Sequence, residues 1–85
     1  MAKIVQFRQA VADVIRSRRT LAGLTQSQLA KRIGGSEIGV RTWERAASGP
    51  SLETFLLLAA ALGVDARELL AEVLSRMAFL QNRDG

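Results

Sequence analysis

LTQSQLAKRIGGSEIGVRTWER, residues 24–45, is the stretch that decides the fold, because it predicts two short helices with a tight turn between them. Thr25 is a favourable N-cap, and Gln28 three residues later completes a capping box, so a helix is expected over 26–33. The Gly-Gly pair that follows ends this helix, because glycine adopts the left-handed backbone conformation without a β-carbon clash.

A second helix is expected from Glu37 to about Arg45, with Ser36 as its N-cap. Its inward residues are predicted to be Val40 and Trp43. Two helices joined by a tight glycine-containing turn form a helix-turn-helix unit, whose second helix can lie in the major groove of DNA. A plain helical hairpin within a small bundle is the alternative, since such hairpins are also common.

Three further helices are predicted outside this stretch. The first spans about 7–22, another spans 52–62, and the last is capped by Asp65 and can continue to about Gln81. No segment alternates with a period of two, so no sheet is expected and the fold class is all-α. The apolar residues expected to be available for the core are Phe7, Val11, Val14, Ile15, Leu21, Leu29, Ala30, Ile33, Leu52, Phe55, Leu56, Ala59, Leu62, Leu69 and Leu70.

The chain resembles the phage-repressor helix-turn-helix family, also called the Cro or xenobiotic-response-element type. The elements that carry the resemblance are Leu24-Thr25-Gln26, Leu29-Ala30, Gly34, Ser36, Val40 and Glu44-Arg45. The resemblance covers roughly residues 11–74 and implies a five-helix repressor-like DNA-binding domain whose last helix is extended. Members commonly carry glycine where Ala46 stands and an apolar or small polar residue where Gly35 stands.

The composition limits the class of protein. The 85 residues suit a single domain over 1–85, with a core of about 7–74 and an extension at 75–81. Cys and His are absent, so disulfides and thiolate sites are excluded, and neither a metal nor a cofactor is expected. The start of the chain does not read as a signal peptide, and the apolar run 54–64 is too short to cross a bilayer. A cytoplasmic, nucleoid-associated protein without a membrane partner is therefore expected.

Charge is distributed unevenly along the chain. Residues 1–50 carry nine Lys and Arg against three Asp and Glu, whereas residues 51–85 carry three against five. A basic segment favours a polyanionic partner, either nucleic acid or an anionic membrane. A merely solvated basic face is the alternative.

Contacts with base edges are expected from the exposed N-terminal part of the helix 37–45. Glu37 can accept from cytosine N4, Ile38 can pack on a thymine methyl group, and Arg41 can donate to guanine O6 and N7. Thr42 can donate or accept. A phosphate contact is the alternative for Arg41, because most protein–DNA contacts go to the backbone.

Phosphate contacts are expected near the ends of the same two helices. The free N–H groups and polar side chains of Thr25 and Gln26 suit a phosphate, and the family resemblance also implies a backbone contact for Gln26. Ser36 has the same double interpretation as Thr25, as a cap and as a phosphate ligand. Arg45 and Ser48 are placed for the flanking backbone.

The resemblance also implies a structural ion pair between Arg19 and Glu44. This pair would hold the recognition helix in a fixed orientation against the first helix, and loss of one partner would leave an uncompensated charge. Trp43 is expected in the core rather than as a platform for base stacking.

The last helix continues an apolar stripe beyond the core, formed by Val73, Met77, Phe79 and Leu80. An exposed apolar stripe suggests an interface, and a two-fold homodimer is the default closed assembly. Such a dimer would present two recognition helices about 34–36 Å apart to a palindromic operator. The alternative is that the tail folds back on Ile4, Val5 and Phe7.

The predicted function is sequence-specific binding of double-stranded DNA by a dimeric bacterial or phage transcription regulator, most simply a repressor. The second hypothesis is an antitoxin that binds a protein toxin and its own promoter, with the apolar stripe as the toxin contact. A protein-interaction module that kept the fold without DNA binding is the third hypothesis. A protein partner, if one exists, would be a toxin or an anti-repressor. An enzyme is not expected, because nothing supplies a nucleophile and its base.

Overall fold

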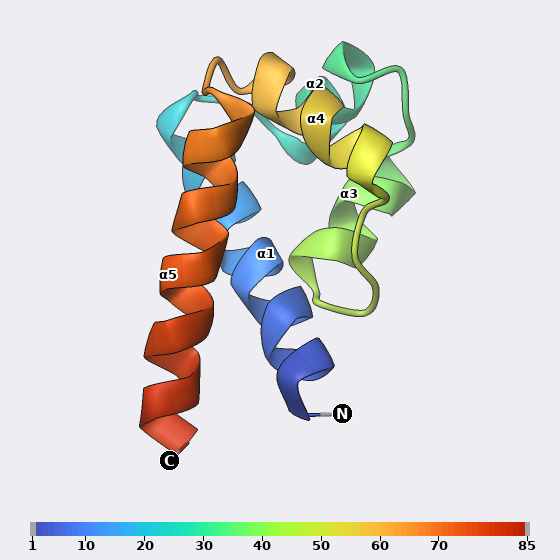
Figure 1. The fold of residues 1–85 in the computed structure, drawn as a ribbon. Helices are drawn as coiled ribbons and strands as arrows, with labels where there is room; N and C mark the ends of the chain where they lie inside the picture. The colour runs from blue at the N-terminus through green and yellow to red at the C-terminus, as the bar shows by residue number, and fades with distance from the viewer. Residues whose placement is uncertain (1, 85) are drawn as a thin grey trace.

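The computed structural model describes the backbone of residues 2–84 and the side chains of residues 6–83. These residues form α1 (Ala2–Leu21), α2 (Gln26–Arg32), α3 (Glu37–Glu44), α4 (Leu52–Ala61) and α5 (Ala66–Asp84). No strand occurs in this described part, so the all-α prediction is confirmed. The long helices α1 and α5 lie side by side, and α2, α3 and α4 are grouped next to them (Figure 1).

Side-chain caps explain where three of the helices begin. The Thr25 hydroxyl accepts from the backbone N–H of Gln28 at 3.0 Å, and the Gln28 side chain accepts from the backbone N–H of Thr25 at 2.8 Å. Ser36 and Ser51 cap α3 and α4 in the same way, each through its hydroxyl oxygen. The starts predicted at 26, 37 and 52 are therefore confirmed.

The first and last helices are longer than predicted. α1 begins at Ala2 rather than near Phe7, and α5 reaches Asp84 rather than ending near Gln81. Neither glycine nor proline interrupts these two helices. α1 and α5 also pack against each other, which stabilises both of them. The alternative in which the tail folds onto Ile4 and Val5 concerns side chains outside the described residues.

The backbone conformation at the end of α3 explains why family members commonly carry glycine at the position that Ala46 occupies in this chain. Ala46 has a φ of 60°, and it is the one residue other than glycine with positive φ in the described part of the chain. The N–H groups of Ala46 and Ala47 bond to the carbonyl groups of Trp43 and Thr42, each at 3.1 Å, which closes a Schellman motif. A β-carbon in this conformation costs about 1–2 kcal/mol, which glycine avoids.

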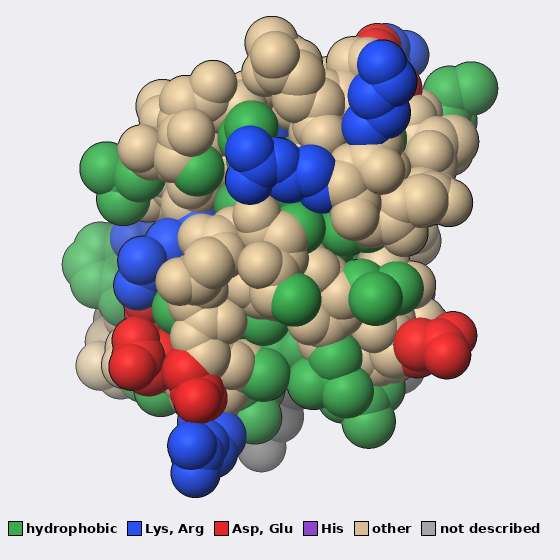
Figure 2. All heavy atoms as spheres, turned by 90° about the horizontal axis from the view of Figure 1, so that it is seen from above, with side chains coloured by type: hydrophobic (Ala, Val, Ile, Leu, Met, Phe, Trp, Pro, Cys, Tyr) green, Lys and Arg blue, Asp and Glu red, His purple; other side chains and the backbone are tan. Residues whose placement is uncertain are grey.

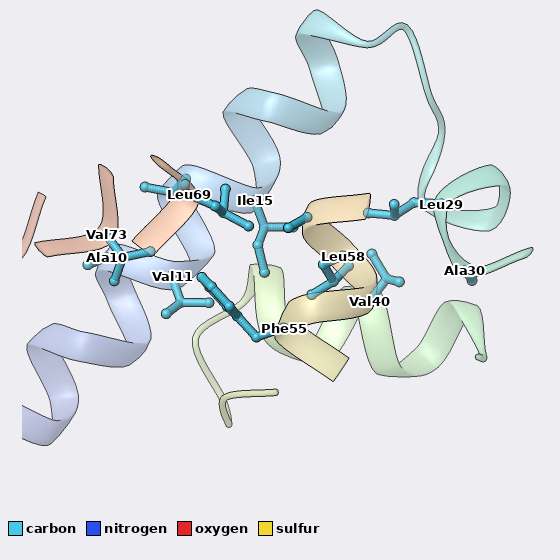
Figure 3. Close-up of a cluster of buried hydrophobic side chains, with 12 residues drawn as sticks. Ala10, Val11, Ile15, Leu29, Ala30, Val40, Phe55, Leu58, Leu69 and Val73 are labelled. Carbon is cyan, nitrogen blue, oxygen red and sulfur yellow. The ribbon is translucent and has the colours of Figure 1, made fainter. Parts of the chain in front are cut away.

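The core draws side chains from all five helices, as Figure 3 shows. The largest fully buried side chains are Val11, Ile15, Leu29, Val40, Leu58, Leu69 and Val73. Most of the predicted core positions on α1 and α2 lie in this cluster or against it, which confirms the helical spacing used to predict them.

α4 presents a different face to the core than predicted. Leu58, which was not predicted to be inside, is fully buried, whereas Leu52 and Leu56 are 75% and 50% exposed. The helix reads LETFLLLAAA and is apolar on nearly every side, so periodicity cannot select its inward face. Leu21 and Leu70 were also wrongly placed inside: Leu21 is the last residue of α1, and Leu69 occupies the inward position next to Leu70.

The apolar stripe of α5 is largely covered by the chain itself. Val73 is fully buried, so its assignment to an exposed dimer interface is wrong. Met77 and Leu80 are partly buried against the core, because α1 packs along α5. Phe79 remains half-exposed, with the Arg76 guanidinium 4.8 Å from its ring centroid.

Two ion pairs join α1 to α5 beside this stripe. Arg76 Nε donates to Asp13 Oδ2 at 2.8 Å, and the Arg18 guanidinium donates to both carboxylate oxygens of Glu72. The Glu72 hydrogen bond raises the pKa of Arg18. Because these groups are partly exposed and screened by solvent, they contribute more to alignment of the helices than to stability.

Candidate nucleic-acid interface

α2 and α3 pack against each other across the predicted glycine turn. Gly34 has a φ of 67°, a conformation that favours glycine, and its N–H bonds to the Lys31 carbonyl at 3.2 Å. The Gly35 N–H bonds to the Ala30 carbonyl at 2.9 Å. These two bonds end α2 and turn the chain into α3, so residues 24–45 form a helix-turn-helix unit.

α3 has a buried side and an exposed side. Val40 and Glu44 are buried, whereas Glu37, Ile38 and Arg41 are exposed. Ile38 is the most solvent-accessible large apolar side chain of this helix, at 70% exposed. Three of the four side chains predicted to read base edges, Glu37, Ile38 and Arg41, therefore lie together on the outward side of α3.

Two local contacts organise that outward side. Arg41 Nη2 donates to Glu37 Oε2 at 2.8 Å, four residues back along the helix. The Thr42 hydroxyl donates to the Ile38 carbonyl at 2.7 Å, and Thr42 is half-buried. The Thr42 hydroxyl proton is thus engaged within the helix, and its oxygen is the atom that suits an external donor.

The predicted phosphate ligands lie around the same unit. Thr25 and Ser36 are exposed N-caps whose oxygens already accept backbone N–H groups. Arg45 is exposed directly after α3, and Ser48 is half-buried in the loop that follows. Gln26 was predicted to contact a phosphate. In the structure its side-chain amide is directed to Glu44 instead and donates to Oε1 at 3.1 Å.

Arg19 and Glu44 form a bidentate ion pair that joins α1 to the end of α3. Arg19 Nε donates to Glu44 Oε2 at 2.6 Å and Nη2 donates to Oε1 at 2.9 Å. The Glu44 side chain is only 3% exposed, and its hydrogen bond raises the pKa of Arg19. Arg19 Nη1 also donates to the Leu24 carbonyl at 2.8 Å, so the pair fixes both ends of the segment that contains α2 and α3.

Sequence reasoning missed one member of this network. Arg16 Nη2 donates to the Glu44 carbonyl at 2.6 Å and so satisfies an acceptor at the C-terminal end of α3. Arg16 and Arg19 are three residues apart, a spacing that places them on one face of α1. That spacing was the available signal, but it could not show that the face meets α3 rather than solvent.

Several cations of the basic half are engaged in contacts within the chain. Arg32 Nη1 donates to the Ala61 carbonyl at 3.1 Å, and Arg18 pairs with Glu72. Figure 2 views the molecule from above Figure 1, and there Lys and Arg side chains are scattered among acidic and apolar ones. Among the described residues on the face that Figure 2 shows, Lys and Arg do not form a continuous patch. The candidate interface is defined instead by the exposed side chains of α3.

Within the described residues, no group of three or more acidic side chains is arranged to hold a metal ion. Over the same part of the chain, every helix is too short or too polar to span a membrane.

A family model described as helix-turn-helix, HTH_3, matches residues 15–69. The chain belongs to the HTH_3 helix-turn-helix family. The match runs from the middle of α1 into α5 and so contains the complete unit formed by α2 and α3. HTH_3 proteins of the Cro and C1 type are DNA-binding transcription regulators and not enzymes.

Solved structures of regulators share the fold. The clp gene regulator ClgR from Corynebacterium glutamicum matches with a TM-score of 0.84 and 27% identity, covering 92% of this chain and 83% of its own. A hypothetical transcription factor, NHTF, from Neisseria matches at 0.71 and 34%, covering 75% and 74%. A mutant of the restriction-modification controller protein C.Esp1396I matches at 0.79 and 19%, covering 86% and 97%, which is a likeness of fold alone. No curated protein matches the sequence.

Proposed function

We propose that this HTH_3 chain is a sequence-specific regulator that binds double-stranded DNA as a dimer and represses transcription from a palindromic operator. The observation that carries the proposal is the outward side of α3, where Glu37, Ile38 and Arg41 are exposed together. The buried pair of Arg19 and Glu44 holds this helix against α1. A helix fixed in this way can present its side chains to the major groove in one orientation.

Solved relatives support the regulatory part of the proposal. One is named a clp gene regulator and another a hypothetical transcription factor, at 27% and 34% identity to this chain. A dimer that only occupies its operator excludes polymerase, so repression requires nothing beyond DNA binding. Its place of action would be the nucleoid in the cytoplasm.

The contacts with DNA fall into two sets in this proposal. Ile38, Arg41 and Thr42 reach base edges, with Glu37 beside them. The phosphate backbone is bound at both ends of the unit by Thr25, Gln26, Ser36, Arg45 and Ser48. One amide proton of Gln26 is already donated to the Glu44 carboxylate. The second amide proton is the one that would be donated to a phosphate.

Selection of bound fragments from genomic DNA tests the function. We expect enrichment of one palindromic motif and a steep loss of affinity as salt rises. On the enriched site, Arg41→Ala should weaken binding roughly tenfold to a hundredfold and relax the preference at one base pair of each half-site. Arg83→Ala, at the far end of α5, removes the same charge and should leave the preference unchanged. No enriched motif, together with no effect of Arg41→Ala, would defeat the proposal.

We assign the dimer interface to an apolar groove rather than to the stripe of α5. Its lining residues come from α1, α4, α5 and the loop before α4, and they are Phe7, Pro50, Leu52, Phe55, Leu56, Ala66, Arg67 and Leu70. Arg67 is the one charged lining residue in the described part of the chain, and its guanidinium pairs with Asp65 of the same chain at 3.2 Å. A groove without free charge, rimmed by exposed leucines, suits a second copy of itself better than a charged partner.

Leu56→Glu should shift the monomer–dimer equilibrium strongly towards monomer. The half-exposed Leu56 side chain would lie at the centre of this interface, and burial of an unpaired carboxylate there is unfavourable. Sedimentation over a range of concentrations should show a dimerisation constant weakened about tenfold or more. Leu21→Glu changes an exposed leucine outside the groove and serves as the control. If Phe79→Glu disrupts the dimer and Leu56→Glu does not, the interface lies on α5 instead.

The antitoxin hypothesis depended on an exposed α5 stripe as the toxin contact. Because Val73 is buried and Met77 and Leu80 are partly covered, that support is removed. Co-purification with a second protein remains the observation that would reopen it.

A further inference from the structure

Two of the proposed base-reading side chains contact each other on the recognition helix. Arg41 Nη2 lies 2.8 Å from Glu37 Oε2, and the two side chains are 49% and 45% exposed. The carboxylate precedes the guanidinium by four residues, which is the more favourable order for such a pair on a helix. Glu37 also lies in the first turn of α3, where the helix dipole stabilises a negative charge.

The contact occupies only one nitrogen of the Arg41 guanidinium. The remaining N–H groups lie in the same plane and can still form two parallel hydrogen bonds. Guanine O6 and N7 accept a pair of bonds of this kind in the major groove. Arg41 can therefore keep Glu37 as a partner while it donates to a guanine.

The Glu37 carboxylate has a second effect, on binding to the DNA backbone. A carboxylate accepts hydrogen bonds but cannot donate to a phosphate, and the phosphates repel its charge. An arginine without this partner has many side-chain conformations and can reach phosphates of any sequence. Glu37 thus restricts Arg41 and also makes non-specific binding less favourable.

We propose that Glu37 is a positioning residue that determines specificity by holding Arg41 towards the guanine of a G·C base pair and away from the phosphates. This inference rests on the proposed function, and it differs from the prediction that Glu37 accepts from a cytosine of its own. The two residues then act as one reading unit for one base pair. The effect of Glu37 in the wild-type chain is to raise the ratio of specific to non-specific affinity, and not the affinity for DNA alone.

Glu37→Gln tests the inference, because glutamine keeps the size of the side chain and removes its charge. Dissociation constants are measured on the selected operator, on operators with each G·C pair replaced, and on an unrelated duplex. We expect tighter binding to the unrelated duplex, weaker binding to the operator, and a roughly tenfold fall in the ratio of the two affinities, comparable to the loss of one base contact. Glu68→Gln makes the same charge change on α5 and should leave the ratio unchanged, and thermal unfolding confirms that both variants are folded.

The double variant with Arg41→Ala separates the two roles of Glu37. If Glu37 positions Arg41, both single variants relax the preference at the same base pair and their effects are not additive. Additive effects at two different base pairs, or an unchanged affinity ratio in Glu37→Gln, would overturn the inference while the function stands. A wild-type chain without any sequence preference would overturn the proposed function and this inference together.

Discussion

Glu44→Ala should lower the free energy of unfolding by about 3–5 kcal/mol, as expected when one partner of a buried ion pair is removed. The Arg19 guanidinium would lose both carboxylate oxygens, and the Gln26 amide would lose its acceptor. For a domain of this size, with a total stability on the order of 5–10 kcal/mol, the loss corresponds to a fall in Tm of about 15 °C or more. Thermal and urea unfolding monitored by circular dichroism measure it.

The matched control is Glu53→Ala, which removes an exposed carboxylate from the first turn of α4. Its effect should stay within about 1 kcal/mol, since exposed charges contribute little. A double-mutant cycle of Glu44→Ala with Arg19→Ala should give a large coupling energy, because each residue loses its partner in the single variant. Equal and small losses in Glu44→Ala and Glu53→Ala would show that the ion pair does not stabilise the fold.

The same variant has a functional consequence. Glu44 is contacted by Arg16 and Arg19 of α1 and by Gln26 of α2, so these contacts set the orientation of α3. Below its melting temperature, Glu44→Ala should therefore lose operator affinity although no residue of the outward side of α3 is changed. Preserved affinity would mean that packing of Val40 and the Arg16 bond to the backbone carbonyl of residue 44 are sufficient to orient α3.

Leu58→Ala should cost about 2–5 kcal/mol of stability, because it removes a fully buried leucine and leaves a cavity. Leu58 points into the cluster that contains Ile15, Val40 and Phe55 (Figure 3), so few neighbouring side chains can move to fill the space. The measurement is the midpoint of urea unfolding at constant slope.

Leu57→Ala gives the comparison within the same helix. The chemical change and the gain in helix propensity are the same as in Leu58→Ala. Because Leu57 is 46% exposed, Leu57→Ala should lower the free energy of unfolding by less than about 1 kcal/mol. Similar losses in both variants would mean that α4 is oriented differently against the core than Figure 3 shows.

Local sequence signals were sufficient for the parts of the fold that depend on neighbouring residues. The capping box at Thr25, the cap at Ser36 and the turn at Gly34 each use contacts within a few residues, so the limits of α2 and α3 could be predicted closely. The outward position of Glu37, Ile38 and Arg41 followed from helical spacing once Val40 was placed inside. These signals left a plain helical hairpin as the alternative, and the family resemblance favoured the helix-turn-helix unit.

Other features depended on what a distant segment supplies. The all-apolar α4 gave no local reason to bury Leu58 rather than Leu56, and the choice depends on the positions of α1, α3 and α5. The α5 stripe was interpreted as an open surface because the sequence did not show that α1 would pack along it and bury Val73. For Glu44 only the family resemblance indicated a partner, and the contacts from Arg16 and Gln26 were not foreseen.

The order of residues along the chain thus determined the number of helices, the ends of α2 and α3, and the composition of the candidate DNA-reading side, because hydrogen bonds across a few residues and the 3.6-residue period control those features. The tertiary structure decided which leucines became core, which apolar surface stayed open, and how α3 is held. Those outcomes depend on burial and ion pairing between segments far apart in sequence, such as Arg19 and Glu44, and they exist only once the helices have packed.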